Sequence, residues 1–221
     1  MLVIKHLTVN GGVAMRRFLV GCTVILVLIW VDPLAAQNEI PSPEKQIVAA
    51  VSPAPAEMKN GATVLGYDQN GDLVTLREGT NELICIADDP NVDRFHVACY
   101  FKEMEPFMER GRELRAEGLS REEVMAIRKQ EIESGELAWP DKPMALYSLS
   151  GSDSGYDYSR DQLNSASPLY VVYVPYATEE NTGIATKPAS EGAPWLMNPG
   201  EPWAHIMIST GRTLGEESSD E

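Results

Sequence analysis

Histidine and cysteine are scarce in this sequence, and their scarcity excludes several kinds of site. The 221 residues include 3 histidines and 3 cysteines, and no two histidines have the H-x-H or H-x-x-x-H spacing that would place both on one metal ion. No C-x-x-C pair, phosphate-binding glycine loop or Walker lysine is present. We therefore expect no metal and no cofactor.

Basic residues are also few: 18 lysines and arginines stand against 33 acidic residues, a net charge of −15. Such a charge repels nucleic acid, and no stripe of basic and aromatic residues offsets it. We exclude nucleic acid as a partner. We interpret the acidity as favouring solubility, with binding of cations or basic partners as the alternative.

The N-terminal apolar run is too short for a stable membrane anchor. Residues 18–31 carry no charge, but these 14 residues fall short of the about 20 that span a bilayer. Two arginines precede the run and two alanines follow it closely, which is the pattern of a secretory signal. We expect residues 1–36 to be a cleaved signal peptide, with Met15 as an alternative start, and the protein to be periplasmic or secreted.

A competing pattern ends at Cys22 and resembles the lipobox of bacterial lipoproteins, in which the cysteine becomes the acylated first residue. Nine further uncharged residues follow Cys22. Acylation there would leave an exposed apolar tail, so we favour cleavage after residue 36.

Cleavage would leave Cys85 and Cys99 as the only cysteines, and would move the charge to −17 by removing three basic residues and one acidic residue. In an oxidising compartment these two cysteines, fourteen positions apart, most simply pair. The alternatives are a thiol nucleophile and a pair of metal ligands. We expect an intramolecular disulfide.

Composition divides the remaining chain into three parts. Residues 37–57 contain four prolines separated by small residues, which is typical of an extended linker. Residues 58–212 have the apolar content of one globular domain, and residues 213–221 form an acidic tail that we expect to be disordered.

Strand patterns occur on both sides of a helical segment. Residues 62–67 and 73–76 flank an Asn-Gly turn and predict a hairpin, and a calcium loop at this turn is disfavoured by the spacing of its carboxylates. Further apolar runs predict the other strands at residues 82–87, 144–149, 169–174 and 205–208.

Between residues 101 and 137 the apolar period becomes helical. Gly118 and then Ser120 with Glu123 mark the end of one helix and the capping box of the next. The first helix presents an apolar face of Met104, Phe107, Met108, Gly111 and Leu114, and the second presents Val124, Ile127 and Ile132. The fold class is therefore α+β, with a mainly antiparallel sheet and a two-helix insertion.

No catalytic set is recognisable. Residues 151–155 include an Asp-Ser-Gly sequence, but the neighbours that serine proteases and nucleophile elbows require are missing. The better candidates are ligand-binding residues: Trp195 and Trp203 offer rings for stacking near His205, and Arg77 offers a cation.

The block of residues 77–81 (Arg-Glu-Gly-Thr-Asn), followed by Cys85 and, far downstream, by the run of residues 205–208 (His-Ile-Met-Ile), resembles a group of small bacterial exported proteins of uncharacterised function. The resemblance covers most of residues 58–209. It implies export and supplies no catalytic residue.

These observations favour an exported bacterial protein that binds a small molecule or a protein partner and is not an enzyme. The alternative is a secreted or periplasmic hydrolase with an unrecognised active site, in which His205 works with a carboxylate.

Overall fold

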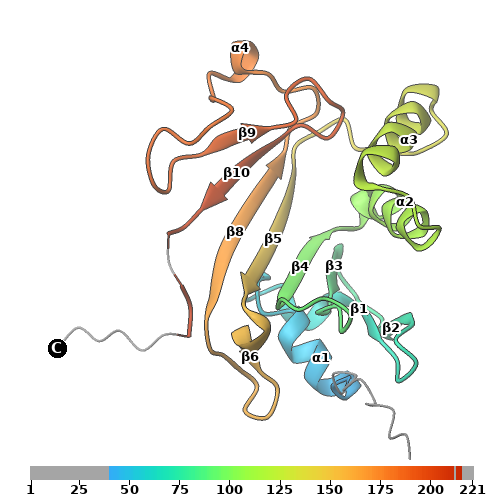
Figure 1. Cartoon of the computed structure of the whole chain (residues 1–221), viewed down its shortest axis with the longest axis vertical. Helices are drawn as coiled ribbons and strands as arrows, with labels where there is room; N and C mark the ends of the chain where they lie inside the picture. The colour runs from blue at the N-terminus through green and yellow to red at the C-terminus, as the bar shows by residue number, and fades with distance from the viewer. Residues whose placement is uncertain (1–39, 212, 216–221) are drawn as a thin grey trace, which may run out of the picture. The chain divides into compact units, whose positions relative to one another are not determined.

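The computed structural model describes residues 40–211 and 213–215, all of which belong to one compact unit. The expected signal peptide, Met15 and Cys22 lie outside the described residues. The main sheet has eight strands in the order β2-β1-β3-β4-β5-β8-β10-β9, and β6 pairs only with β7 (Figure 1). Every pairing is antiparallel except that of β1 with β3, so the α+β prediction is confirmed.

The strands are β1 (Thr63–Tyr67), β2 (Leu73–Arg77), β3 (Leu83–Ile86), β4 (His96–Phe101), β5 (Met144–Gly151), β6 (Tyr156–Asp157), β7 (Gln162–Leu163), β8 (Ala166–Tyr173), β9 (Trp195–Met197) and β10 (His205–Ser209). The α-helices are α1 (Pro43–Ala50), α2 (Glu105–Ala116), α3 (Arg121–Ser134) and α4 (Glu179–Thr182), and single 3-10 turns lie at Lys59–Gly61, Lys102–Met104 and Asp153–Gly155.

Side chains alternate along each strand, so the sheet has two differently covered faces. On one face α1 buries Ala49 and Ala50 near the Cys85–Cys99 disulfide. On the other face, Met104 at the start of α2 packs against Tyr100 and Met144. Helices α2 and α3 thus stand over the face opposite α1 (Figure 1).

The prediction that residues 37–57 form an extended linker was wrong. Pro43 begins α1, and the buried Gln46 amide donates to the backbone carbonyl oxygens of Pro41 and Tyr67, both at 2.8 Å. Its Oε1 accepts the N–H of Tyr67, also at 2.8 Å. Helix α1 therefore belongs to the domain, because the Gln46 side chain bonds to both the N–H and the carbonyl of Tyr67 on β1, as the backbone of a neighbouring strand would.

The prediction that the disordered C-terminal tail begins at residue 213 was also wrong for residues 213–215. Leu214 and Ala166 exchange two backbone hydrogen bonds of 2.7 and 3.0 Å, so residues 213–215 are attached to β8. Residues 216–221 lie outside the described part of the chain.

The helical insertion matches its prediction closely. Ser120 accepts the N–H of Glu123 while the Glu123 carboxylate accepts the N–H of Ser120, which completes the capping box. The predicted face of α2 is confirmed, because Met104, Phe107, Gly111 and Leu114 are buried and Met108 is half-buried. On α3 the buried residues are Val124 and Arg128, whereas Ile127 and Ile132 are only half-buried.

The Arg-Glu-Gly-Thr-Asn block forms the turn between β2 and β3. The N–H groups of Thr80 and Asn81 donate to the Gly61 carbonyl, at 2.8 and 3.0 Å. A Cβ atom on Gly79 would lie 2.2 Å from the backbone nitrogen of Thr63, so only glycine allows this approach. The block is therefore structural.

The disulfide between Cys85 and Cys99 is confirmed, and it joins directly opposed residues of β3 and β4. Both cysteines are fully buried. A disulfide fits an oxidising compartment and thus an exported protein. No helix within residues 40–211 and 213–215 is long and apolar enough to cross a membrane.

Candidate functional site

A cavity of about 480 Å³ lies between the α2–α3 hairpin and the part of the sheet formed by β8 and β10. We call it the arginine pocket. Three kinds of side chain and one asparagine form its wall. They are the arginines Arg115, Arg121 and Arg128, the ring-containing Phe107, Tyr173, Trp203 and His205, the apolar Met108, Leu119, Val124 and Met125, and Asn198.

Among the described residues, the wall of this pocket contains three arginines and no aspartate or glutamate. Acidic residues outnumber basic ones in the chain by 33 to 18, so this local excess of positive charge runs against the average composition. The pocket is thus a cationic site on an acidic protein, a setting that attracts anions.

Arg128 is the most buried of the three arginines, at 7% exposure. It follows Val124 by four residues, which places both side chains on the inward face of α3. Its Nη1 donates to the Phe107 carbonyl at 2.9 Å, and its guanidinium carbon lies 3.7 Å from the centre of the Phe107 ring. Burial lowers the pKa of Arg128 to about 10, so the side chain stays charged at neutral pH.

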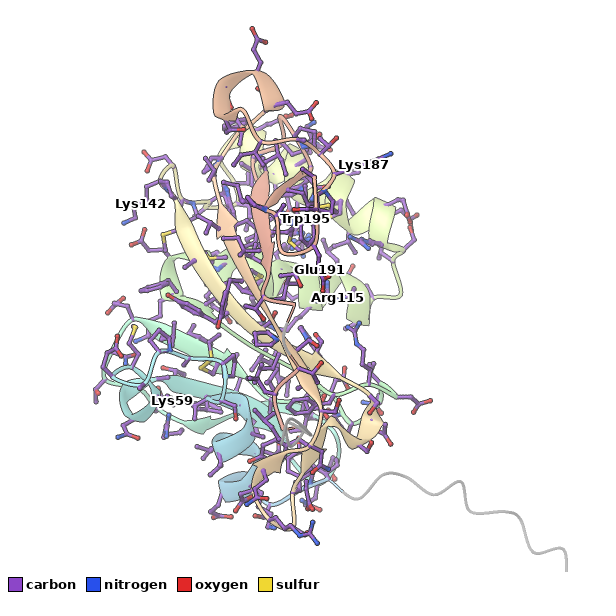
Figure 2. All side chains as sticks on the ribbon, turned by 90° about the vertical axis from the view of Figure 1, so that its left-hand side faces the viewer. Lys59, Arg115, Lys142, Lys187, Glu191 and Trp195 are labelled. Carbon is purple, nitrogen blue, oxygen red and sulfur yellow. A yellow bond between two sulfur atoms is a disulfide. The ribbon has the colours of Figure 1, made fainter. Side chains whose placement is uncertain are left out.

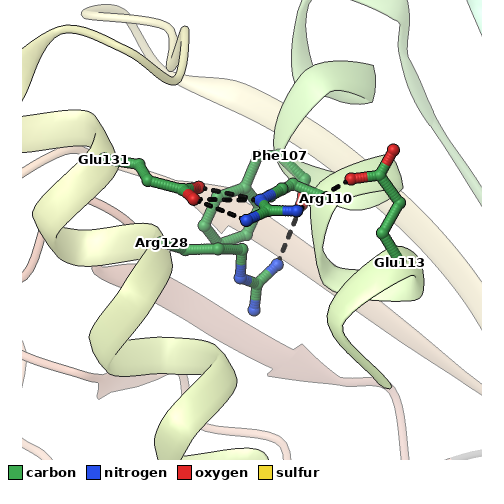
Figure 3. Close-up of polar contacts among 5 residues, drawn as sticks. All are labelled: Phe107, Arg110, Glu113, Arg128 and Glu131. Atoms are coloured by element: carbon green, nitrogen blue, oxygen red, sulfur yellow. Dashed lines mark hydrogen bonds and ion pairs between the residues drawn. The ribbon is translucent and has the colours of Figure 1, made fainter. Parts of the chain in front are cut away.

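Arg110, on the same α2–α3 hairpin, differs from Arg128 in that its charge is paired with carboxylates. It donates to Glu131 at 2.7 to 3.0 Å and to Glu113 at 3.1 Å. Figure 3 shows Arg110 held between these two carboxylates, whereas Arg128 bonds only to Phe107 among the residues drawn. Neither Arg115 nor Arg128 forms an ion pair within the described residues.

Arg115 and Arg128 converge above Gly111. A Cβ atom on this buried glycine would lie 2.6 Å from Nη1 of Arg128 and 3.4 Å from Nη1 of Arg115. Partial burial, and then the charge of Arg112, lowers the pKa of Arg115. Because Gly111 has no side chain, the guanidinium groups of Arg115 and Arg128 can both lie against this position.

Aromatic side chains form the wall that faces the helices. The rings of Tyr173 and His205 lie 5.1 Å apart, and the Trp203 ring lies 5.6 Å from that of Phe107. The indole Nε1 of Trp203 is buried and donates to no acceptor in the described residues. The Nε of Arg128 is likewise buried without an acceptor.

A hydrogen bond to the backbone fixes the orientation of the His205 ring. Its Nδ1 donates to the carbonyl oxygen of Trp203 at 2.9 Å, and burial lowers its pKa below the ordinary value of 6.5. A backbone carbonyl, and no carboxylate, therefore orients this imidazole.

The structure brings together two of the four ligand-binding residues expected from the sequence. Trp203 and His205 both line the arginine pocket. Trp195 pairs with Met207 on β10, two positions beyond His205, and does not line the pocket.

Arg77 lies on β2, at the opposite edge of the sheet from β9, so it does not join this cluster. It donates to the carbonyl oxygens of Ala62 at 3.1 Å and Lys59 at 2.6 Å. Figure 2 shows Lys59 in the lower half of the molecule and Trp195 in the upper half. The cation that Arg77 was expected to supply comes from Arg115 and Arg128, which the sequence analysis did not select.

A second, wider groove of about 830 Å³ adjoins the arginine pocket and shares Met108, Arg115 and Tyr173 with it. His96 lies in this groove, and its Nδ1 is 3.0 Å from the Oγ of Ser150. Burial lowers the pKa of His96. Within the described residues, this is a Ser–His hydrogen bond without a carboxylate bonded to the imidazole.

Asp88 lines the same groove and is a source of pH dependence. Its Oδ1 accepts the N–H of His96 at 2.7 Å, yet burial raises its pKa from 3.8 to about 6, with the nearby charges of Asp153 and Asp89 adding to the effect. A raised pKa in the folded state means that protonation stabilises the fold. This contribution is complete below pH 3.8 and is lost as the pH rises through 6.

Replacing Asp88 with asparagine should therefore raise the free energy of unfolding at pH 7 by about 1 to 2 kcal/mol, after allowance for partial exposure. The amide oxygen can still accept the His96 N–H. Urea denaturation at pH 4 and pH 7 would measure the change, with the exposed Asp93→Asn as a control. Equal pH dependence in the wild type and Asp88→Asn would contradict this assignment.

Comparison of the chain with protein-family models, with curated proteins and with solved structures found no match. Among residues 40–211 and 213–215, no group of three or more histidine, cysteine, aspartate or glutamate side chains is placed to hold a metal ion. The chemistry of the arginine pocket is therefore the basis on which a function can be argued.

Proposed function

We propose that this protein is an exported bacterial module that binds a small ligand in the arginine pocket and does not catalyse a reaction. The observation that carries the proposal is the pocket itself: about 480 Å³, apolar and aromatic over much of its wall, with a few polar groups converging. Small-molecule sites have this size and this composition. Periplasmic or secreted localisation, and the resemblance to small exported proteins, are parts of the same proposal.

Binding is favoured over catalysis by the state of His205. A general base needs a partner that orients it and a proton to abstract nearby, as in the Ser-His-Asp arrangement. The Nδ1 of His205 donates to the Trp203 carbonyl, which orients the ring but, unlike the aspartate of a triad, carries no negative charge to stabilise an imidazolium. Neither a serine nor a cysteine is among the described residues that line this pocket.

A hydrolase remains the second candidate, and the hydrogen bond between His96 and Ser150 favours it. These residues belong to β4 and β5, at the adjoining groove rather than at the arginine pocket. Turnover of an ester, peptide or glycoside that disappears in Ser150→Ala or His205→Ala, with the fold intact, would replace the binding proposal.

The binding proposal predicts different effects for two tryptophans. In a thermal-shift screen of small anions, cations and neutral molecules, at least one class should raise the melting temperature of the wild type. For that ligand, Trp203→Phe should weaken binding at least fivefold, because Trp203 lines the pocket and supplies an indole donor. Trp195→Phe should leave the affinity unchanged, because Trp195 lies outside the pocket.

Calorimetric titration of the two variants measures this difference. Equal losses in Trp203→Phe and Trp195→Phe would place the ligand elsewhere. Failure of every class to bind the wild type would exclude a small-molecule function and favour a protein partner.

A further inference from the structure

We propose that the ligand of the arginine pocket is an organic anion, whose carboxylate or phosphate headgroup lies between Arg115 and Arg128 and whose apolar body lies against Phe107 and Trp203. The inference rests on the proposed function of the same pocket. It adds the chemical class of the ligand.

The first argument is that the buried Arg128 forms no ion pair within the described residues. A buried guanidinium is costly unless an anion pairs with it. The nearest acidic residue along α3 is Glu131, whose carboxylate oxygens accept from Arg110 at 2.7 to 3.0 Å. Arg128 instead donates to a backbone carbonyl and, at 2.8 Å, to the sulfur of Met125, which are neutral acceptors. An anion in the pocket would supply the missing negative charge.

The second argument is that two residues lining the pocket have buried polar atoms without a partner in the described residues, and that both atoms are donors. The Nε of Arg128 and the Nε1 of Trp203 are buried and have no acceptor in the described residues, and both side chains are more than nine-tenths buried. Guanidinium and indole nitrogens can donate hydrogen bonds but cannot accept them. The pocket therefore calls for a ligand with acceptor oxygens, as carboxylates and phosphates have.

The third argument is the convergence of two guanidinium groups. Arg115 and Arg128 come from different helices, yet an atom at the Cβ position of Gly111 would lie within 3.4 Å of both. Like charges repel at such short range unless something negative lies near them. Arg115 is also exposed and lines the adjoining groove, so it can meet an anion entering from solvent.

The apolar part of the wall indicates that the ligand is more than an inorganic ion. Phe107, Val124 and Trp203 are buried, and Met108, Leu119 and Met125 are half-buried around the same cavity. A free phosphate would leave the exposed parts of Met108, Leu119 and Met125 in contact with water, whereas a hydrocarbon or aromatic body would cover them.

The test uses five probes with the full chain: octanoate, octyl phosphate, octan-1-ol, octylammonium and inorganic phosphate, each titrated calorimetrically. We expect octanoate or octyl phosphate to bind at least tenfold more tightly than the alcohol, the ammonium and the inorganic ion. Which of the two headgroups binds better distinguishes a carboxylate from a phosphate ligand.

The variants Arg115→Gln and Arg128→Gln should each weaken binding of the preferred anion at least tenfold. Arg160→Gln is the matched control, because it changes the net charge equally at an exposed residue between β6 and β7. Arg128→Lys keeps the charge and should retain more affinity than Arg128→Gln, which separates loss of charge from loss of packing. Melting temperatures of all variants show whether the fold is intact.

Three results would overturn the inference. Binding of octan-1-ol or octylammonium as tight as that of the anions would leave a ligand-binding pocket that does not select anions, so the proposed function would stand without it. Inorganic phosphate binding as tightly as octyl phosphate would remove the organic body from the proposal. Equal affinities in Arg128→Gln, Arg115→Gln and Arg160→Gln would place the anion outside this pocket.

Discussion

Replacing Phe107 with alanine should lower the free energy of unfolding by about 3 to 5 kcal/mol, as is usual for a buried phenylalanine. Phe107 is 4% exposed, and its ring lies 4.5 Å from that of Trp139 and 5.6 Å from that of Trp203. The guanidinium of Arg128 lies over the same ring. Loss of the ring therefore removes the contact that joins α2 to the aromatic residues beside β10, together with a cation–π interaction.

Chemical denaturation followed by far-UV circular dichroism measures this loss. Phe107→Leu, which keeps an apolar side chain, should lose less than Phe107→Ala. Tyr176→Ala is a control for removing an aromatic ring at the surface, because Tyr176 is 53% exposed. A denaturation midpoint for Phe107→Ala equal to that of the wild type would mean that the apolar face of α2 is free to bind a partner.

The second large effect concerns the disulfide. Replacing both Cys85 and Cys99 with alanine should lower the free energy of unfolding by about 3 kcal/mol, because the cross-link closes a loop of fourteen positions that the unfolded chain would otherwise explore. Both side chains are fully buried, in the cluster that also holds Ala50 of α1, Val64 of β1 and Leu83 of β3. The loss should therefore also loosen the contact between α1 and the sheet.

Wild type and double variant are compared with and without a strong reductant. The reductant should lower the midpoint of the wild type toward that of the double variant and leave the double variant unchanged. If the reductant shifts neither protein, the Cys85–Cys99 bond does not contribute to stability.

Local patterns determined those parts of the fold whose signals lie close together in the sequence. The first hairpin, β1 with β2, depends on a turn that Gly71 completes at a φ of +83°. The α2–α3 hairpin depends on the Ser120–Glu123 capping box and on Gly118 and Gly135, both at positive φ. In each case the deciding interactions join residues a few positions apart, so the sequence alone was enough to predict them.

The tertiary structure alone decided the role of α1. Eight residues are too few for a stable isolated helix, and the prolines around it are typical of a linker. The helix is stabilised by burial of Ala49 and Ala50 on the sheet and by the bonds of Gln46 to Tyr67, twenty-one positions away. No local pattern contains that information.

The candidate site divides in the same way. The sequence by itself determined that Trp203 and His205 lie close together, because a single residue separates them, and that Cys85 and Cys99 are the only cysteines in residues 37–221. It could not place Arg77, because strand order decides which residues meet, and β2 and β9 are opposite edges of one sheet. Nor could it select the inward-facing Arg128 or the exposed Arg115, because arginines are usually paired or solvated. Only the packing of α2 on α3 brings their guanidinium groups together at Gly111, where neither forms an ion pair within the described residues.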